Sequence, residues 1–141
     1  MWNPSPVPMP FQWPAGVNVL VVNEDEAFQI ASVHGNVREA AERLFKAHGA
    51  RVVITLGANG AHYFGGNDHV LVSAAPLPGP VVDTTGAGDC FTGALAAHLC
   101  SVHGELTDKD FTKALAFANR AAAFSVTRRG AMNSYPNKSQ V

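Results

Sequence analysis

The segment DTTGAGD, at residues 83–89, combines two glycines with an acidic residue where a long apolar stretch begins. Glycine lets the backbone approach a ligand closely, and the first N–H groups of a helix have no partner within that helix. We therefore expect the N–H groups of Ala87, Gly88 and Asp89 to form an anion hole at the positive end of a helix dipole. Such a hole stabilises a phosphoryl group in transfer, and Asp89 could accept the proton of an attacking hydroxyl. The alternative is a glycine-rich turn that caps a buried helix, with Asp89 as a partner of the dipole.

The elements ahead of this segment alternate between strands and helices. Apolar runs at residues 17–22 and 51–55 predict buried strands. An acidic first turn after Asn23 predicts a helix that Gly35 closes, and Asn36 is a good N-cap for a second helix that Gly49 ends. Strand, helix and strand at this spacing predict a βαβ unit with parallel strands.

The rest of the chain adds a hairpin and two helices. Residues 61–64 and 69–73 flank the turn sequence GGND, which predicts a β-hairpin. Small apolar residues over 87–102 predict a buried helix that Gly104 terminates, and Thr107 with Asp110 resembles a capping box for a helix to about residue 126. Residues 1–16 are rich in proline and predict an extended lead-in. The predicted fold class is α/β.

Composition narrows the class of protein. With 141 residues the chain is long enough for one domain, and its 47% hydrophobic and 15% charged residues permit a packed core. The formal charge of −1 argues against nucleic-acid or anionic-membrane partners. No apolar run reaches the roughly 18 residues of a membrane span. Cys90 and Cys100 would lie about 15 Å apart on one helix, too far for a disulfide. These features predict a protein of the cytoplasm, or also of the nucleus.

Four segments in order resemble one known family. DTTGAGDCF at residues 83–91 resembles the signature D-T-T/V-G-A-G-D-x-F of the ribokinase-like carbohydrate kinases, the PfkB superfamily. NPSP at 3–6, NEDEA at 23–27 and VITLGANG at 53–60 resemble three further motifs of that family. Residues 126–131 and 134–136 are most similar to the ribokinase group within it. The resemblance implies a three-layer ribokinase-like α/β fold.

The resemblance also implies a reaction, the ATP-dependent phosphorylation of D-ribose to ribose 5-phosphate. In it, Asp89 would be the catalytic base towards the sugar's 5-hydroxyl, and Gly86, Ala87, Gly88 and Asp89 would form the anion hole. The nucleotide would be lined by Thr55, Leu56, Gly57, Ala58, Asn59 and Gly60, by Gly88 and Asp89, and on its adenine side by Asn119.

Two metal ions are implied in the same way. Asn23 and Glu26, three residues apart on one helical face, would order waters around a nucleotide-bound Mg²⁺. A K⁺ site beside the anion hole would fall on Asp83, Thr85, Ser125, Arg128 through its carbonyl, Gly130 and Ser134. The alternatives are a plain N-cap for Asn23, a solvated acid for Glu26 and a plain strand end for residues 55–57.

The resemblance covers only about the second half of the family's length. The sugar-contacting motifs G-S-x-N and G-G-K-G-x-N and the small lid sheet, through which ribokinases largely dimerise, have no counterpart here. Residues 1–141 are thus expected to form a partial kinase domain, truncated to the nucleotide-binding half of the central sheet and its flanking helices, with an exposed apolar strand edge. We expect this chain alone to be a weak or inactive kinase. The alternatives are a short form that binds nucleotide or a partner without catalysis, and another PfkB sugar or nucleoside kinase.

Overall fold

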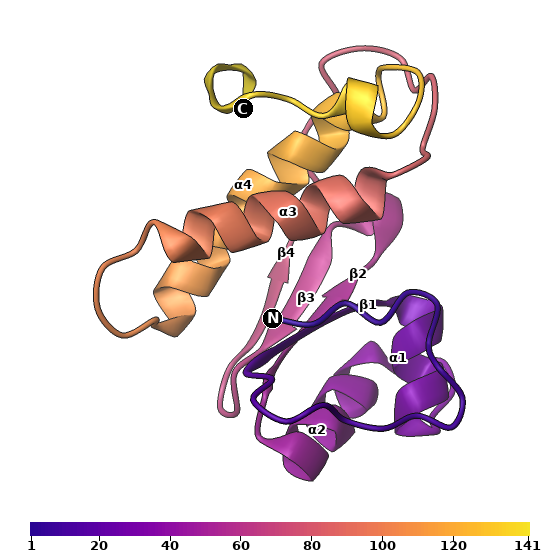
Figure 1. The fold of residues 1–141 in the computed structure, drawn as a ribbon, viewed down its shortest axis with the longest axis vertical. Coiled ribbons are helices and arrows are strands. Elements are labelled where there is room, and N and C mark those ends of the chain that lie inside the picture. Colours follow the sequence, from indigo (N-terminus) through magenta and orange to yellow (C-terminus); the bar gives the residue numbers. More distant parts are fainter. The chain divides into compact units, whose positions relative to one another are not determined.

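The computed structural model describes residues 1–141, which divide into two compact units. Unit 1 comprises Met1–Gly57 and Ala61–Leu71, and unit 2 comprises Ala58–Gly60 and Val72–Val141. A mixed sheet with flanking helices confirms the α/β class (Figure 1). No helix combines the length and the apolar character that a membrane span requires.

The sheet has four strands in the order β1 (Val19–Asn23), β2 (Arg51–Thr55), β3 (Ala61–Phe64) and β4 (His69–Val72). β1 and β2 are parallel, whereas β2 and β3 are antiparallel. The parallel pair confirms the predicted βαβ unit, and adjacent β3 and β4 confirm the hairpin.

Two helices, α1 (Glu24–Ala31) and α2 (Val37–His48), connect the parallel strands and pack with the sheet in unit 1 (Figure 1). Asn36 caps α2 by accepting from the Glu39 amide, and Gly49 ends it at φ +67°, both as predicted. The prediction that Gly35 closes α1 is wrong. Ser32, at φ 53°, is already the C-cap, because the chain turns left-handed there and its N–H bonds to the Phe28 carbonyl.

One apolar cluster holds unit 1 together. The apolar face of each helix packs against strand residues on one face of the sheet. This is expected when an amphipathic helix covers a half-buried sheet. Its buried members are Leu20, Val22, Ala27, Val33, Ala40, Ala41, Leu44, Val52, Ile54 and Phe64.

The outer edge of β1 is not the open apolar edge that we expected. The Trp2 N–H donates to the Val19 carbonyl and the Trp2 carbonyl accepts from the Val21 N–H, both at 2.9 Å, which makes a parallel bridge to Leu20. The Asn3 side chain adds a bond of 2.8 Å to the Val21 carbonyl. The first residues of the lead-in therefore satisfy three backbone groups of β1 that an edge strand would otherwise expose.

Unit 2 is built on α3 (Ala87–Cys100) and α4 (Asp108–Ser125), which pack against each other (Figure 1). Thr107 and Asp110 form the predicted capping box at the start of α4. α3 ends slightly earlier than predicted, at Cys100 with Ser101 as its C-cap, so that Gly104 lies in the connection and does not terminate the helix. Cys90 and Cys100 are both on α3 and unbridged, as expected. Short 3₁₀ helices cover Gly57–Asn59, Met132–Ser134 and Lys138–Gln140.

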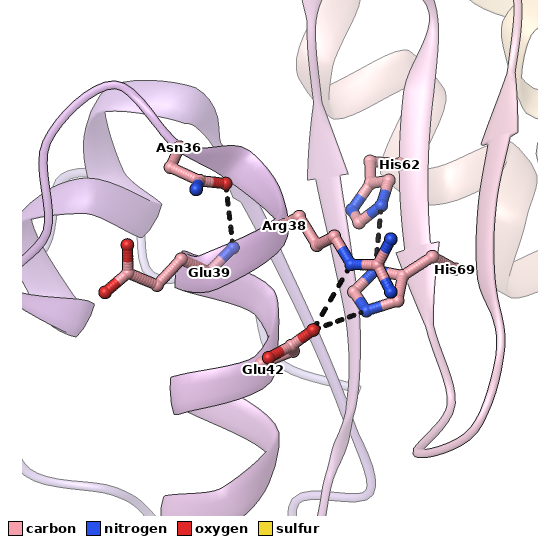
Figure 2. Close-up of polar contacts among 6 residues, drawn as sticks. All are labelled: Asn36, Arg38, Glu39, Glu42, His62 and His69. Carbon is pink, nitrogen blue, oxygen red and sulfur yellow. Dashed lines mark hydrogen bonds and ion pairs between the residues drawn. The ribbon is translucent and has the colours of Figure 1, made fainter.

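A polar chain joins the hairpin to α2 within unit 1 (Figure 2). His62 Nε2 lies 3.2 Å from His69 Nδ1, and His69 Nε2 lies 3.0 Å from the Glu42 carboxylate, which also pairs with Arg38 at 3.3 Å. Because Glu42 accepts from His69 Nε2, neutral His69 must accept at Nδ1 from His62 Nε2. With this tautomer, His62 Nδ1 carries no proton and is buried without a hydrogen-bond partner.

The stability of unit 1 should therefore fall on acidification. Burial above all, with the charges of His69 and Arg38, lowers the pKa of His62 from its ordinary 6.5. The unfolded ring binds a proton more readily, so this contribution is complete above pH 6.5 and is lost as the pH falls through the lower pKa of the folded state. Burial also lowers the pKa of His48, so this group adds to the loss of stability on acidification. The Glu42 contribution lies in a separate window below pH 4.5.

We expect the free energy of unfolding, measured with urea, to decrease between about pH 7 and about pH 5. His62→Gln, which keeps a donor towards His69 but cannot titrate, should reduce that decrease, and the exposed His34→Gln should not. An equal pH dependence in the wild type and His62→Gln would contradict the assignment.

Candidate active site

The N-terminus of α3 is shaped by Gly86, which precedes it at φ +76°. A Cβ at this position would lie 2.8 Å from both the Ala131 Cβ and the Tyr135 hydroxyl oxygen. The left-handed backbone and the crowding both require glycine there. The loop after α4 thus packs directly on the turn that starts α3, a long-range contact within unit 2 that no local sequence signal predicts.

Two N–H groups are free at this helix start. The Ala87 N–H donates to the Thr84 carbonyl at 3.2 Å, and the first regular helical bond runs from Cys90 to Gly86 at 2.9 Å. The expectation of three unpaired groups is therefore wrong for Ala87, because the turn before the helix already supplies its acceptor. Gly88 and Asp89 keep unpartnered N–H groups, the arrangement that binds an anion at a helix N-terminus.

The Asp83 carboxylate ties the loop before α3 to the loop after α4. One oxygen accepts from the Thr85 N–H at 3.0 Å and the other from the Gly130 N–H at 2.8 Å. The backbone bonds from Thr85 and then Gly130 lower the pKa of Asp83 to about 2. The group is thus an anion at neutral pH. The Val82 and Asp83 N–H groups also donate to the Val126 carbonyl, at 2.8 and 3.2 Å, which reinforces the same connection.

Asp89, the predicted base, is exposed in the first turn of α3. It lines an open groove of about 520 Å³ whose other walls come from α3, α4 and the C-terminal residues, Tyr135 and Pro136 among them. Burial and then the charge of Asp89 raise the pKa of Tyr135 above its ordinary 10. The carboxylate is therefore accessible to a substrate hydroxyl from solvent.

Of the other predicted K⁺ ligands, Thr85 and Gly130 contact the Asp83 carboxylate through their N–H groups, whereas Ser125, Arg128 and Ser134 lie at the end of α4 and in the loop after it. Ser125 and Ser134 are buried, and their hydroxyls donate to the Ala122 and Ala131 carbonyls at 2.8 and 2.6 Å. The guanidinium of Arg128 lies over the Phe124 ring at 4.1 Å, so only its backbone carbonyl is available as a ligand. The set offers oxygens and one anion, which suits a hard monovalent cation.

In unit 1, Asn23 and Thr55 end the two parallel strands and are register partners. Ligands of open α/β sheets bind outside these carboxyl ends. Asn23 is the N-cap of α1: its side chain accepts from the Glu26 N–H at 2.8 Å, and Glu26 Oε2 accepts from the Asn23 N–H at 2.9 Å. Glu26 is partly exposed, and the capping box uses only one of its two carboxylate oxygens. The Mg²⁺ role of Asn23 and Glu26 stays a prediction.

The predicted nucleotide segment divides between the units. Thr55, Leu56 and Gly57 belong to unit 1, whereas Ala58, Asn59 and Gly60 belong to unit 2. In unit 2, Asn119 is buried on α4 and donates to the backbone carbonyls of Val72 and Ser73. Gly60 rests on the same two residues. The sequence motif at residues 55–60 therefore begins in unit 1 and ends in unit 2.

Comparison with known proteins identifies the family. The pfkB family of carbohydrate kinases matches residues 3–138. The chain is 34% identical, over 151 aligned residues, to the ribokinase of Schizosaccharomyces pombe. The crystal structure of the Thermotoga maritima ribokinase superposes with a TM-score of 0.79 over 98% of this chain at 28% identity. The fructokinase of Vibrio cholerae with bound fructose, ADP and calcium gives a TM-score of 0.78 over 86% of this chain at 30% identity. The chain belongs to the pfkB family of carbohydrate kinases.

The chain spans less than half the length of these relatives. It covers 45% of the Schizosaccharomyces ribokinase, 46% of the Thermotoga structure and 39% of the Vibrio structure. The family resemblance drawn from the DTTGAGDCF segment and its companions is confirmed. The roles of individual site residues stay predictions.

Gly86→Ala should lower the stability of unit 2 by about 1–3 kcal/mol, because a side chain at positive φ is strained and its Cβ would collide with Ala131 and Tyr135. Gly93→Ala, within α3, is the matched control, because nothing lies within 4 Å of a Cβ there. The control should be neutral or stabilising by up to about 1 kcal/mol. Denaturant unfolding measures the free energy of unfolding of both variants. An equal change in the two variants would contradict the packing described for Gly86.

Proposed function

We propose that this chain carries the nucleotide-binding part and the catalytic base of a ribokinase-type kinase, which transfers the γ-phosphoryl group of ATP to the 5-hydroxyl of D-ribose. The observation that supports this most directly is the start of α3, where the carboxylate of Asp89 follows two unpartnered N–H groups. A base and an anion hole on one turn are what phosphoryl transfer to a hydroxyl requires.

The step assigns one role to each group. Asp89 takes the proton of the 5-hydroxyl, the sugar oxygen forms a bond to the γ-phosphorus, and the bond from that phosphorus to the β,γ-bridging oxygen breaks, releasing ADP. The N–H groups of Gly88 and Asp89 donate to the phosphoryl oxygens while charge is redistributed among them. Because Gly86 and Asp83 fix this turn from both sides, the donors need no reorganisation during transfer.

The nucleotide would lie along residues 55–60. Thr55 ends a parallel strand, and the following 3₁₀ turn presents backbone groups with no large side chain in the way. Gly57 and Gly60 both adopt positive φ, which suits a turn that comes close to phosphate or ribose.

Mg²⁺ brought by the nucleotide would neutralise phosphate charge, and Glu26 would hold it only through waters. The capping box occupies Glu26 Oε2, so one carboxylate oxygen remains for this purpose. Such a contact suits Mg²⁺, which keeps several waters and takes few protein ligands.

Two observations favour alternative functions. The Vibrio fructokinase resembles this chain about as closely as the Thermotoga ribokinase does, so another sugar acceptor of the same family is the second candidate. Because the family's sugar-contacting motifs have no counterpart in residues 1–141, nucleotide binding without catalysis is the third.

The purified chain should bind Mg·ATP but form ADP in the presence of ribose far more slowly than the Thermotoga ribokinase assayed beside it. The reason is that the base and the anion hole lie in this chain, whereas the sugar-contacting motifs do not. Calorimetry measures the binding, and a coupled assay with ribose, fructose or no sugar measures the turnover. Any ribose-dependent turnover should be lost in Asp89→Ala, with Asp68→Ala, in the hairpin turn, as the control.

Absence of Mg·ATP binding in a folded sample would contradict the nucleotide assignment. Ribose-dependent turnover that survives Asp89→Ala would contradict the role of the base. Turnover as fast as that of the Thermotoga enzyme and lost in Asp89→Ala would support the base but overturn the expected weakness.

K⁺ should stabilise the chain more than Na⁺ at equal ionic strength, because the Asp83 carboxylate and the nearby hydroxyl and carbonyl oxygens would bind it. Asp83→Asn should remove the difference in melting temperature. With its pKa at about 2, Asp83 is ionised throughout the neutral range, so the effect should be the same at about pH 6 and about pH 8. Equal melting temperatures in K⁺ and Na⁺ would contradict the proposed cation site.

A further inference from the structure

Asn119 is buried on α4, with 6% of its surface exposed, at a distance along the chain from every other residue of the proposed nucleotide site. Its side-chain nitrogen Nδ2 donates to two consecutive backbone carbonyls, Val72 at 3.1 Å and Ser73 at 2.9 Å. These carbonyls lie where β4 ends and the chain leaves the sheet.

The two bonds fix the orientation of the amide. Its nitrogen has two protons to donate, and two carbonyl oxygens take them. Turning the amide over would place Oδ1 against the same two carbonyls, which can only accept, and would leave all three oxygens unsatisfied. The NH₂ group of Asn119 is therefore committed to the backbone and cannot also donate to a ligand.

The backbone segment that Asn119 holds is also the support of Gly60. A Cβ at Gly60 would lie 2.1 Å from the Val72 oxygen, 2.6 Å from the Ala74 nitrogen and 2.6 Å from the Ser73 carbonyl carbon. With φ at +98° as well, the position admits only glycine. Gly60, the last residue of the turn Ala58–Gly60, thus lies directly against residues 72–74, in the same unit.

We infer that Asn119 is a positioning residue that fixes the Ala58–Gly60 turn through residues 72–74. Asn119 is fixed on α4 and donates to the Val72 and Ser73 carbonyls. The backbone at these carbonyls packs against Gly60 and so fixes the position of Gly60. The inference rests on the proposed function only in naming nucleotide phosphate or ribose as what the turn contacts. It assigns to the Asn119 amide nitrogen a role towards the protein, in place of the direct adenine contact that the family resemblance suggested.

Backbone ¹⁵N relaxation of the chain tests the positioning role without any ligand. In Asn119→Ala the order parameters of Gly60, Ser73 and Ala74 should fall from about 0.85 towards about 0.6 or lower, because both anchoring bonds are lost. Leu115→Ala, also at a buried position of α4, is the matched control. It removes core packing but no bond to residues 72–73, so it should lower stability without loosening these three residues. Equal loosening in both variants, or none in Asn119→Ala, would overturn the inference.

Asn119→Asp separates bonding from space filling. A carboxylate has the shape of the amide but would face two carbonyl oxygens with no proton, so these residues should be at least as mobile as in Asn119→Ala. Protonation restores one donor, and lowering the pH should partly reverse the mobility in Asn119→Asp but not in Asn119→Ala. Identical behaviour of the two variants over the pH range would count against the hydrogen bonds as the cause.

The wild-type chain provides a test that no folding defect can obscure. On titration with Mg·ADP, backbone amides of residues 58–60 should shift, while the side-chain Nδ2 protons of Asn119 keep their resonances and their nuclear Overhauser contacts to Ser73. Loss of those contacts on binding would mean that the amide turns to the nucleotide, which overturns the inference. If Mg·ADP shifts no resonance at all, the proposed function fails, and the relaxation experiment still decides the positioning role.

Discussion

The Asp83 carboxylate is the interaction on which the candidate site depends. It accepts one N–H from Thr85, just before α3, and one from Gly130, in the loop after α4, so a single side chain joins segments 47 residues apart. Each bond to an ionised acceptor is stronger than a neutral one, and together they hold the pKa of Asp83 at about 2. With this link in place, the loop after α4 packs on Gly86, and α3 begins with its free N–H groups at one defined point.

The two units contribute different chemistry to the proposed kinase. Unit 1 provides the carboxyl ends of two parallel strands, where Asn23 and Thr55 are neighbours in register. Unit 2 holds Asp89, the unpartnered N–H groups at the start of α3 and the Asp83 carboxylate, to which the proposal assigns the base, the anion hole and part of the cation site. The segment of residues 55–60 belongs partly to each unit.

Local signals predicted the elements well, because caps and stop residues act on their own helix. Asn36, Gly49 and the Thr107–Asp110 box perform their predicted roles. The prediction that Gly35 ends α1 failed because Ser32, three residues earlier, already adopts the left-handed conformation of a C-cap. The family resemblance supplied the site residues, but spacing cannot give hydrogen-bond partners. The Trp2 bridge to β1, the Thr84 acceptor for Ala87 and the Asn119 bonds all join residues through the fold and leave no periodic trace in the sequence.

The proposal that α3 begins with a phosphoryl-binding turn can be tested directly by amide NMR of the chain titrated with Mg·ATP. If the turn binds phosphate, the backbone N–H resonances of Gly88 and Asp89 will move furthest downfield, since these are the two donors without a partner in the protein. The Ala87 resonance, whose N–H is already bonded to Thr84, will move less. Saturable shifts elsewhere in the chain, with Gly88 and Asp89 unchanged, would contradict the assignment of this turn as the anion hole.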